Sequence, residues 1–168
     1  MKIVPFDIND EKLRQSFISE ILPECIGNLA ESARPAWGKM TAQHMLEHLI
    51  MSFELSMGKF YVPFDAPAKQ ARVAKMFLYN DRATPHDFKN PLLGEEPPSL
   101  MHADFDQAKT EFLETLTQFL AHFRTQPSAV HTHPIFGPMG SEEWQRTHFK
   151  HCYHHLLQFG LIKEPDKE

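Results

Sequence analysis

Apolar residues recur along most of the chain at steps of three and four, the spacing that lines one face of an α-helix. No segment shows the alternation of polar and apolar residues that is typical of a half-buried strand. The periodic stretches predict helices over residues 10–35, 41–58, 71–78, 104–123 and 141–162. The expected fold class is therefore all-α.

The ends of the predicted helices carry residues that suit them. Thr41 and Asp104 precede apolar stripes and are good N-caps, and Gly58 suits a C-cap. Ser141 is followed by two glutamates, and acidic residues in a first turn match the positive end of the helix dipole. Pro23 falls inside the first helix and predicts a kink there, because proline has no N–H to donate.

Two segments rich in proline interrupt the helices. Residues 79–100 show no periodicity and are interpreted as a long crossover loop, and residues 126–140 break the chain again before the last helix. Four long helices, a short extra helix and one long connection in the middle predict a four-helix bundle. With 168 residues, of which 42% are hydrophobic, the chain is long enough for a single domain, residues 1–168, with its own core.

Composition argues against several classes of partner. A net charge of −5 and a pI of about 6.1 give no electrostatic reason to expect nucleic acid or an anionic membrane surface. Neither a signal-peptide core nor an apolar run of about 18 residues is found, so we expect a soluble, cytoplasmic protein. Cys25 and Cys152 show no CxxC spacing, which indicates a reducing compartment rather than a disulfide framework.

Histidines gather in two places on the predicted helices. The stretch "HFKHCYHH" holds four of the eleven histidines, and "HMLEH" holds another two. His151 and His155 are four residues apart, so they lie about 40° apart on one helix face and can converge on one ion. His44 and His48 share this offset, so the second helix can supply one or both as ligands. Two histidines from the last helix and one from the second would make a three-His metal site with positions left for water or substrate.

The other polar residues near these pairs receive weaker assignments. His148 continues the stripe of His151 by one turn, whereas His154 is rotated by about 60° and should reach another helix or solvent. Gln158, three residues after His155, is a candidate partner for the metal ligands. Isolated histidines elsewhere are expected to be ordinary structural or surface residues: His86, His102, His122 and His131.

The "HMLEH" segment allows a second interpretation. It matches H-x-x-E-H, in which Glu47 would be the general base of a zinc peptidase. On a helix, however, Glu47 lies about 100° from His48, so it turns toward the flank if His48 meets the pair on the last helix. A ferritin-type di-iron site is excluded, because the sequence contains no Glu-x-x-His.

The segment "HTHPIFGPMG" directly precedes the last helix. Its prolines and glycines fit either a stiff rim of a binding pocket or a purely structural connection, and the sequence leaves both open. Trp37 and Trp144 are expected in the core or in an interface, as is usual for large aromatic side chains.

Three stretches together carry a family resemblance: "PAWGKMTAQHMLEHL", "HPIFGPMGSEEW" and "HCYHHLLQFG". They resemble the DinB-like superfamily of metalloenzymes, and in particular its branch DUF1569, in which a tryptophan and a helix-two histidine precede an H-x-x-H-H-x-x-Q last helix. The resemblance implies a four-helix bundle with a long crossover and a divalent metal held by His48, His151 and His155. His44 departs from the pattern and leaves open which helix-two histidine is the ligand.

Relatives in that superfamily include thiol-dependent transferases and isomerases, in which the metal polarises glutathione, mycothiol or bacillithiol. The resemblance thus implies a metal-dependent transferase or hydrolase acting on a small molecule, with zinc as the first metal and nickel or iron as alternatives. It assigns no catalytic residue. The competing class is a non-catalytic module in which the metal only ties the second helix to the last, and a homodimer is also left open.

Overall fold

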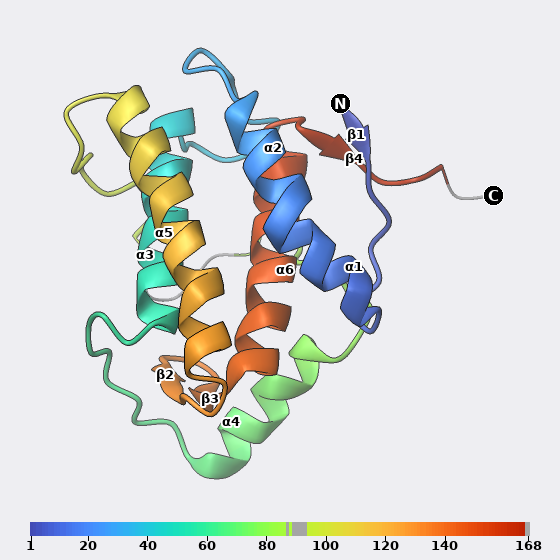
Figure 1. Cartoon of the computed structure of the whole chain (residues 1–168), viewed down its shortest axis with the longest axis vertical. Helices are drawn as coiled ribbons and strands as arrows, with labels where there is room; N and C mark the ends of the chain where they lie inside the picture. Colours follow the sequence, from blue (N-terminus) through green and yellow to red (C-terminus); the bar gives the residue numbers. More distant parts are fainter. Residues whose placement is uncertain (87, 89–93, 167–168) are drawn as a thin grey trace.

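Long helices account for most of the chain that the structure describes (Figure 1). The computed structural model describes residues 1–86, 88 and 94–166. Along the chain the elements are β1 (Lys2–Ile3), α1 (Glu11–Ser16), the π-helical turn η1 (Phe17–Ile21), α2 (Leu22–Gly27), α3 (Ala42–Ser56), α4 (Ala68–Lys75), the 3-10 turn η2 (Met76–Leu78), α5 (Phe105–Thr125), β2 (His131–His133), β3 (Gly137–Met139), α6 (Ser141–Gln158) and β4 (Ile162–Lys163). The prediction of a mostly helical protein is confirmed.

Helix α5 packs along α3, and α6 contacts α3 as well as the N-terminal helices α1 and α2 (Figure 1). Apolar side chains from these elements fill the space between them. Fully buried members of this core include Phe17, Ile26, Met45, Phe53, Phe112 and Phe149. The core therefore fixes α3 against α6, the two helices that carry the predicted metal ligands.

The first helix is interrupted and shorter than predicted. It begins after the N-cap Asp10 and passes through the π-helical turn η1 into α2. This wide turn comes directly before Pro23, where the sequence predicts a kink, because proline cannot donate to the helix ladder. α2 already ends at Gly27: the Asn28 side chain donates to the Glu24 carbonyl (3.0 Å), and the next N–H, of Leu29, turns back to the Ile26 carbonyl (3.1 Å) in a bond that does not continue the α-helix.

The ends of α3 and the start of α5 are those predicted. Thr41 accepts a hydrogen bond from the backbone N–H of His44 (3.2 Å), and Asp104 accepts one from the N–H of Gln107 (2.9 Å). Gly58 follows the last turn of α3 with a φ of +69°, the left-handed conformation that favours glycine.

Two small β-ladders are not predicted by the sequence pattern. β1 and β4 pair in parallel, and β2 and β3 form an antiparallel hairpin. α6 ends at Gln158 rather than near residue 162, because Gly160 adopts a φ of +65° and the Leu161 N–H turns back to the Leu156 carbonyl (2.9 Å). This reversal leads into β4. Strands of two or three residues are too short to show a periodic pattern.

Polar side chains of α6 hold irregular segments of the chain in place. Lys150, only 2% exposed, donates to the carbonyls of Asn80 (2.6 Å) and Arg82 (2.7 Å). Arg146 donates to the carbonyl of Ile8 (3.1 Å). Burying a charged group costs free energy unless its donors are hydrogen-bonded. Lys150 and Arg146 can therefore be buried only because these hydrogen bonds form. They fasten the N-terminal segment and the crossover segment to α6.

Further predictions concern the crossover segment, the cysteines and membranes. Residues 79–86, 88 and 94–100 of the predicted crossover contain no helix or strand, and residues 87 and 89–93 lie outside the described residues. Cys25 and Cys152 are both free and buried. None of the described helices is both long and apolar enough to cross a membrane.

Gly58 offers a test of the close contact between α3 and the β2–β3 hairpin. A Cβ at this position would lie 2.7 Å from Cε1 of His131 and would keep a φ that L-residues disfavour. We expect Gly58→Ala to lower the free energy of unfolding by about 1–3 kcal/mol, as measured by urea unfolding. Gly27→Ala is the matched control, because nothing lies within 4 Å of its Cβ position. Equal losses in both variants would contradict this account.

Candidate metal centre

Three histidines from two helices face one another between α3 and α6. His48 Nε2 lies 2.7 Å from His151 Nε2, which lies 3.2 Å from His155 Nε2. The three nitrogens all lie within 4.8 Å of one another, and no other group of three His, Cys, Asp or Glu ligands forms among the described residues. Neighbouring ligands on one ion, each bound at about 2.0–2.1 Å, are about 3 Å apart. The spacing therefore fits a single metal ion.

Hydrogen bonding alone accounts poorly for this arrangement. An imidazole nitrogen carries either one N–H or one lone pair, directed outward in the ring plane. His151 Nε2 can thus make one good hydrogen bond, yet it has two nitrogen neighbours, on His48 and His155. A cation at the shared point could accept a lone pair from all three rings.

Burial keeps these three rings neutral. Desolvation, with a smaller effect of His154, lowers the pKa of His48 to about 4. Desolvation followed by the neighbouring imidazoles holds the pKa values of His151 and His155 well below the usual value. At neutral pH the rings are therefore in the form that binds metals.

Gln158 fixes the orientation of His155. Its Oε1 lies 2.8 Å from His155 Nδ1, so Nδ1 carries the proton and the lone pair resides on Nε2. The amide nitrogen of Gln158 donates to the Trp37 carbonyl (2.8 Å), which determines which way the amide points. The backbone carbonyl of Gln158 also accepts the N–H of Ala36 (2.7 Å). Gln158 thus lies beside the candidate ligands, as its spacing in the sequence predicts.

His44 is engaged at the start of α3. Its Nδ1 lies 2.8 Å from Thr41 Oγ1, so the imidazole takes part in capping the helix. It does not belong to the group of converging nitrogens. Of the two histidines that the sequence leaves open, the structure brings His48 to the pair on α6.

Glu47 points toward the segment that follows the crossover. Its carboxylate accepts the backbone N–H groups of Met101 (2.7 Å) and His102 (2.9 Å) and the amide of Gln43 (3.1 Å). Burial would raise the pKa of Glu47, but these hydrogen bonds lower it below its usual value. A carboxylate that is ionised and already surrounded by donors is poorly suited to act as a general base.

A comparison with known families bears on this site. The family model described as "Protein of unknown function (DUF1569)" matches residues 18–160. This range runs from η1 past the end of α6 and contains all three histidines. The chain belongs to the DUF1569 family. No curated protein and no solved structure is detectably similar to it.

In this DUF1569 protein an aromatic cluster lies beside the three histidines. The Trp37 ring stacks on His86, with centroids 3.6 Å apart and planes at 8°, and it meets the edge of His154 at 5.4 Å. His154 in turn lies 5.1 Å from His155. The loops that carry Trp37 and His86 therefore reach the site. The sequence did not predict this stacking of His86 on Trp37, because an isolated histidine in an aperiodic loop gives no signal of a contact with a distant loop.

His148 does not join the three histidines, although it continues their stripe by one turn. Its ring is fully buried, stacks on Phe53 at 3.9 Å and lies 5.7 Å from the Trp144 ring. Neither of its ring nitrogens has a hydrogen-bond partner among the described residues. Desolvation, with a smaller effect of His133, lowers the pKa of His148 to about 3.

The β2–β3 hairpin lies beside the first turn of α6 (Figure 1). Trp144, which is fully buried as predicted, donates its indole N–H to the His131 carbonyl (3.3 Å). His151 follows Ser141 by ten residues, which corresponds to about 15 Å along the helix. These contacts favour the structural interpretation of "HTHPIFGPMG" over a pocket rim.

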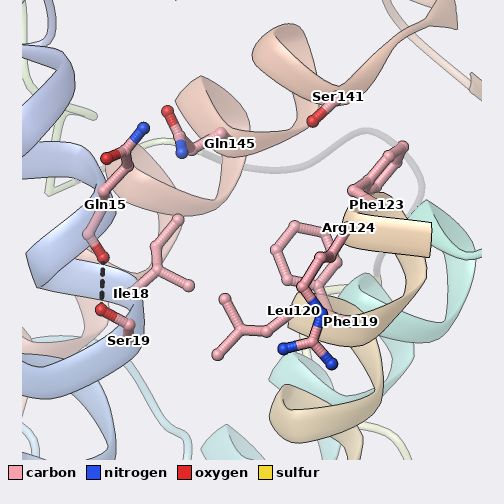
Figure 2. A pocket seen from close by; sticks show the side chains of 9 residues that line it. All are labelled: Gln15, Ile18, Ser19, Phe119, Leu120, Phe123, Arg124, Ser141 and Gln145. Carbon is pink, nitrogen blue, oxygen red and sulfur yellow. Dashed lines mark hydrogen bonds between the residues drawn. The ribbon is translucent and has the colours of Figure 1, made fainter. Parts of the chain in front are cut away.

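A pocket of about 270 Å³ opens elsewhere, between the N-terminal helix, α5 and α6 (Figure 2). Apolar and polar side chains both line it: Gln15, Ile18, Ser19, Phe119, Leu120, Phe123, Arg124, Ser141 and Gln145. None of the three metal-site histidines does. The candidate for chemistry is therefore the three-His site, since the pocket gathers no ligand or nucleophile cluster.

Acid stability tests the burial of His148. The folded pKa of about 3 lies below the ordinary value, so as the pH falls the unfolded chain takes up the proton first. The stabilisation is complete above about pH 6.5 and is lost between about pH 6.5 and 3. In metal-free protein, the free energy of unfolding falls between pH 7 and pH 5. We expect this fall to be about 2 kcal/mol smaller in His148→Phe than in wild type, as measured by urea unfolding at both pH values.

Two further variants complete this test. His148→Leu serves if phenylalanine does not fit, and Phe53→Leu alters the same stack without removing the titrating ring. Phe53→Leu should keep the wild-type pH dependence. Identical pH profiles for wild type and both His148 variants would show that His148 does not contribute.

Proposed function

We propose that His48, His151 and His155 bind one divalent metal ion. The observation that carries this proposal is the convergence of three Nε2 atoms, one from α3 and two from α6, at the spacing of ligands on a single ion. Neutral imidazoles suit zinc first, with nickel or iron as alternatives. The hydrogen bond from His155 to Gln158 is of the kind that metal-bound histidines ordinarily make.

The donor set favours an open site over a closed structural one. No fourth His, Cys, Asp or Glu ligand joins the group within the part of the chain that the structure describes, whereas structural zinc sites have four protein ligands. When bound, a divalent ion with three neutral ligands keeps its full charge and can lower the pKa of a thiol or water. These features support catalysis rather than a mere tie between α3 and α6.

We infer further that the reaction is a transfer to, or hydrolysis of, a small molecule, with a low-molecular-weight thiol such as glutathione, mycothiol or bacillithiol as co-substrate. This rests on the resemblance of the histidine and tryptophan motifs to the DinB-like superfamily. The packing of α1–α2, α3, α5 and α6 is compatible with the four-helix bundle of that superfamily. Two free, buried cysteines suit a cytoplasmic location.

A zinc peptidase with Glu47 as its base is the less supported alternative. Both oxygens of Glu47 already accept backbone N–H groups, from Met101 and His102.

In the thiol-dependent reaction, the chain itself would make three contributions. It would hold the ion through three imidazole rings, orient His155 through Gln158, and shield one side of the site with Trp37 and His86.

Metal content tests the ligand set. Alanine at His48, His151 or His155 should remove tightly bound metal, because each ring supplies one of three donors. His44→Ala and His154→Ala are the matched controls and should keep the metal. Each removes one imidazole from a helix that also carries a proposed ligand, α3 for His44 and α6 for His154. The measurement is elemental analysis of protein purified without a His tag, with circular dichroism to verify folding. Full occupancy in His155→Ala would rule out the proposed set.

A turnover screen separates the candidate reactions. Metal-loaded protein is assayed on electrophiles with and without each thiol, beside a peptidase assay. We expect thiol-dependent turnover that Glu47→Gln leaves within a few-fold of wild type, whereas loss of a true general base costs about 10²–10⁴ in rate. Thiol-independent peptide cleavage abolished by Glu47→Gln would favour the peptidase. Metal binding without any turnover would favour the non-catalytic module.

A further inference from the structure

A second pair of histidines faces each other away from the three-His site. His122 Nε2, near the end of α5, lies 2.9 Å from His131 Nε2 at the start of β2. Both residues are partly exposed, so water can reach the space beside them. Neither belongs to the three-His group.

The spacing of this pair matches two ligands on one ion. With bonds of about 2.0–2.1 Å, nitrogens at a right angle are about 2.9 Å apart, and nitrogens in a tetrahedral arrangement are about 3.3 Å apart. Right-angled coordination by nitrogen and oxygen is typical of Cu²⁺ and Ni²⁺. We propose that His122 and His131 form a second metal site that takes Cu²⁺ or Ni²⁺, with water in the remaining positions.

The backbone around His131 holds its ring in place. The ring lies so close to Gly58 that a Cβ there would come within 2.7 Å of Cε1. The His131 carbonyl accepts the indole N–H of Trp144, and β2 is paired with β3. A donor that is already positioned binds an ion with little loss of side-chain freedom.

The charges near the pair are compatible with a bound cation. Lys59 is engaged with Gln118 (2.6 Å), one turn before His122, and with Glu54 (3.4 Å). The carboxylate of Glu54 balances the charge of this lysine.

An ion at this pair would join the end of α5 to the hairpin that leads into α6. Because the ion would bind the folded chain and not the unfolded one, it would raise the free energy of unfolding in proportion to its occupancy. This second site is independent of the proposed function, since it shares no ligand with the three-His group.

Copper titration of metal-stripped, full-length protein tests the proposal. Isothermal calorimetry is run with Cu²⁺ and with Zn²⁺ on wild type, His122→Ala, His131→Ala and the control His102→Ala. We expect two equivalents of Cu²⁺ in wild type and in the control, and one in either pair variant. The second equivalent should bind Cu²⁺ more tightly than Zn²⁺ and show nitrogen hyperfine coupling in its electron paramagnetic resonance spectrum. Gly58→Ala, which displaces the His131 ring, should weaken only this equivalent.

The outcomes distinguish the two sites. Unchanged Cu²⁺ stoichiometry in His122→Ala and His131→Ala would overturn the proposal and leave an N–H···N hydrogen bond as the reason for the 2.9 Å approach. If the three-His site fails instead, wild type binds one equivalent that the pair variants lose. Circular dichroism on each variant separates loss of a ligand from loss of the fold.

Discussion

A buried polar group must find a hydrogen-bond partner, and helix α6 carries several such groups on its buried side: Arg146, His148, Lys150, His155 and Gln158. Except for His148, these side chains find partners, and most of the partners lie in irregular segments. Lys150 binds the carbonyls of Asn80 and Arg82, and the hydroxyl of Tyr153, also on α6, donates to the carbonyl of Val4 (2.6 Å). Polar groups of one helix thus position the segments around the candidate metal centre, so this site depends on the polar side chains of α6 as much as on its apolar stripe.

The parts of the fold that the sequence predicts are those specified by neighbours along the chain. The limits of α3 follow from Thr41 and Gly58, since a cap acts within three or four residues of itself. The burial of Lys150 could not be predicted in this way, because its partners lie about seventy residues away and lysine is ordinarily exposed. The same holds for the pairing of β1 with β4, which joins the two ends of the described chain.

The same distinction between local and distant information applies to the candidate metal centre. The spacing of His151 and His155 is local information and places both on one face of a helix. The choice of His48 over His44 depends on how α3 packs against α6, which periodicity does not specify. His148 shows the limit of the stripe argument: one turn before His151, the neighbouring helix presents Phe53 rather than another imidazole.

Gln158 joins His155, one of the three candidate ligands, to the backbone of the segment before α3. Gly38, with a φ of +81°, permits this approach, because a Cβ there would lie 3.0 Å from the Gln158 amide nitrogen. Ring orientation at His155 and the conformation of residues 36–38 are consequently linked, and such a coupling free energy is the same in both directions. If the three histidines bind an ion, as proposed, its affinity would be coupled to the conformation of the Trp37 segment, so a molecule that displaced this segment would change metal affinity without touching a ligand.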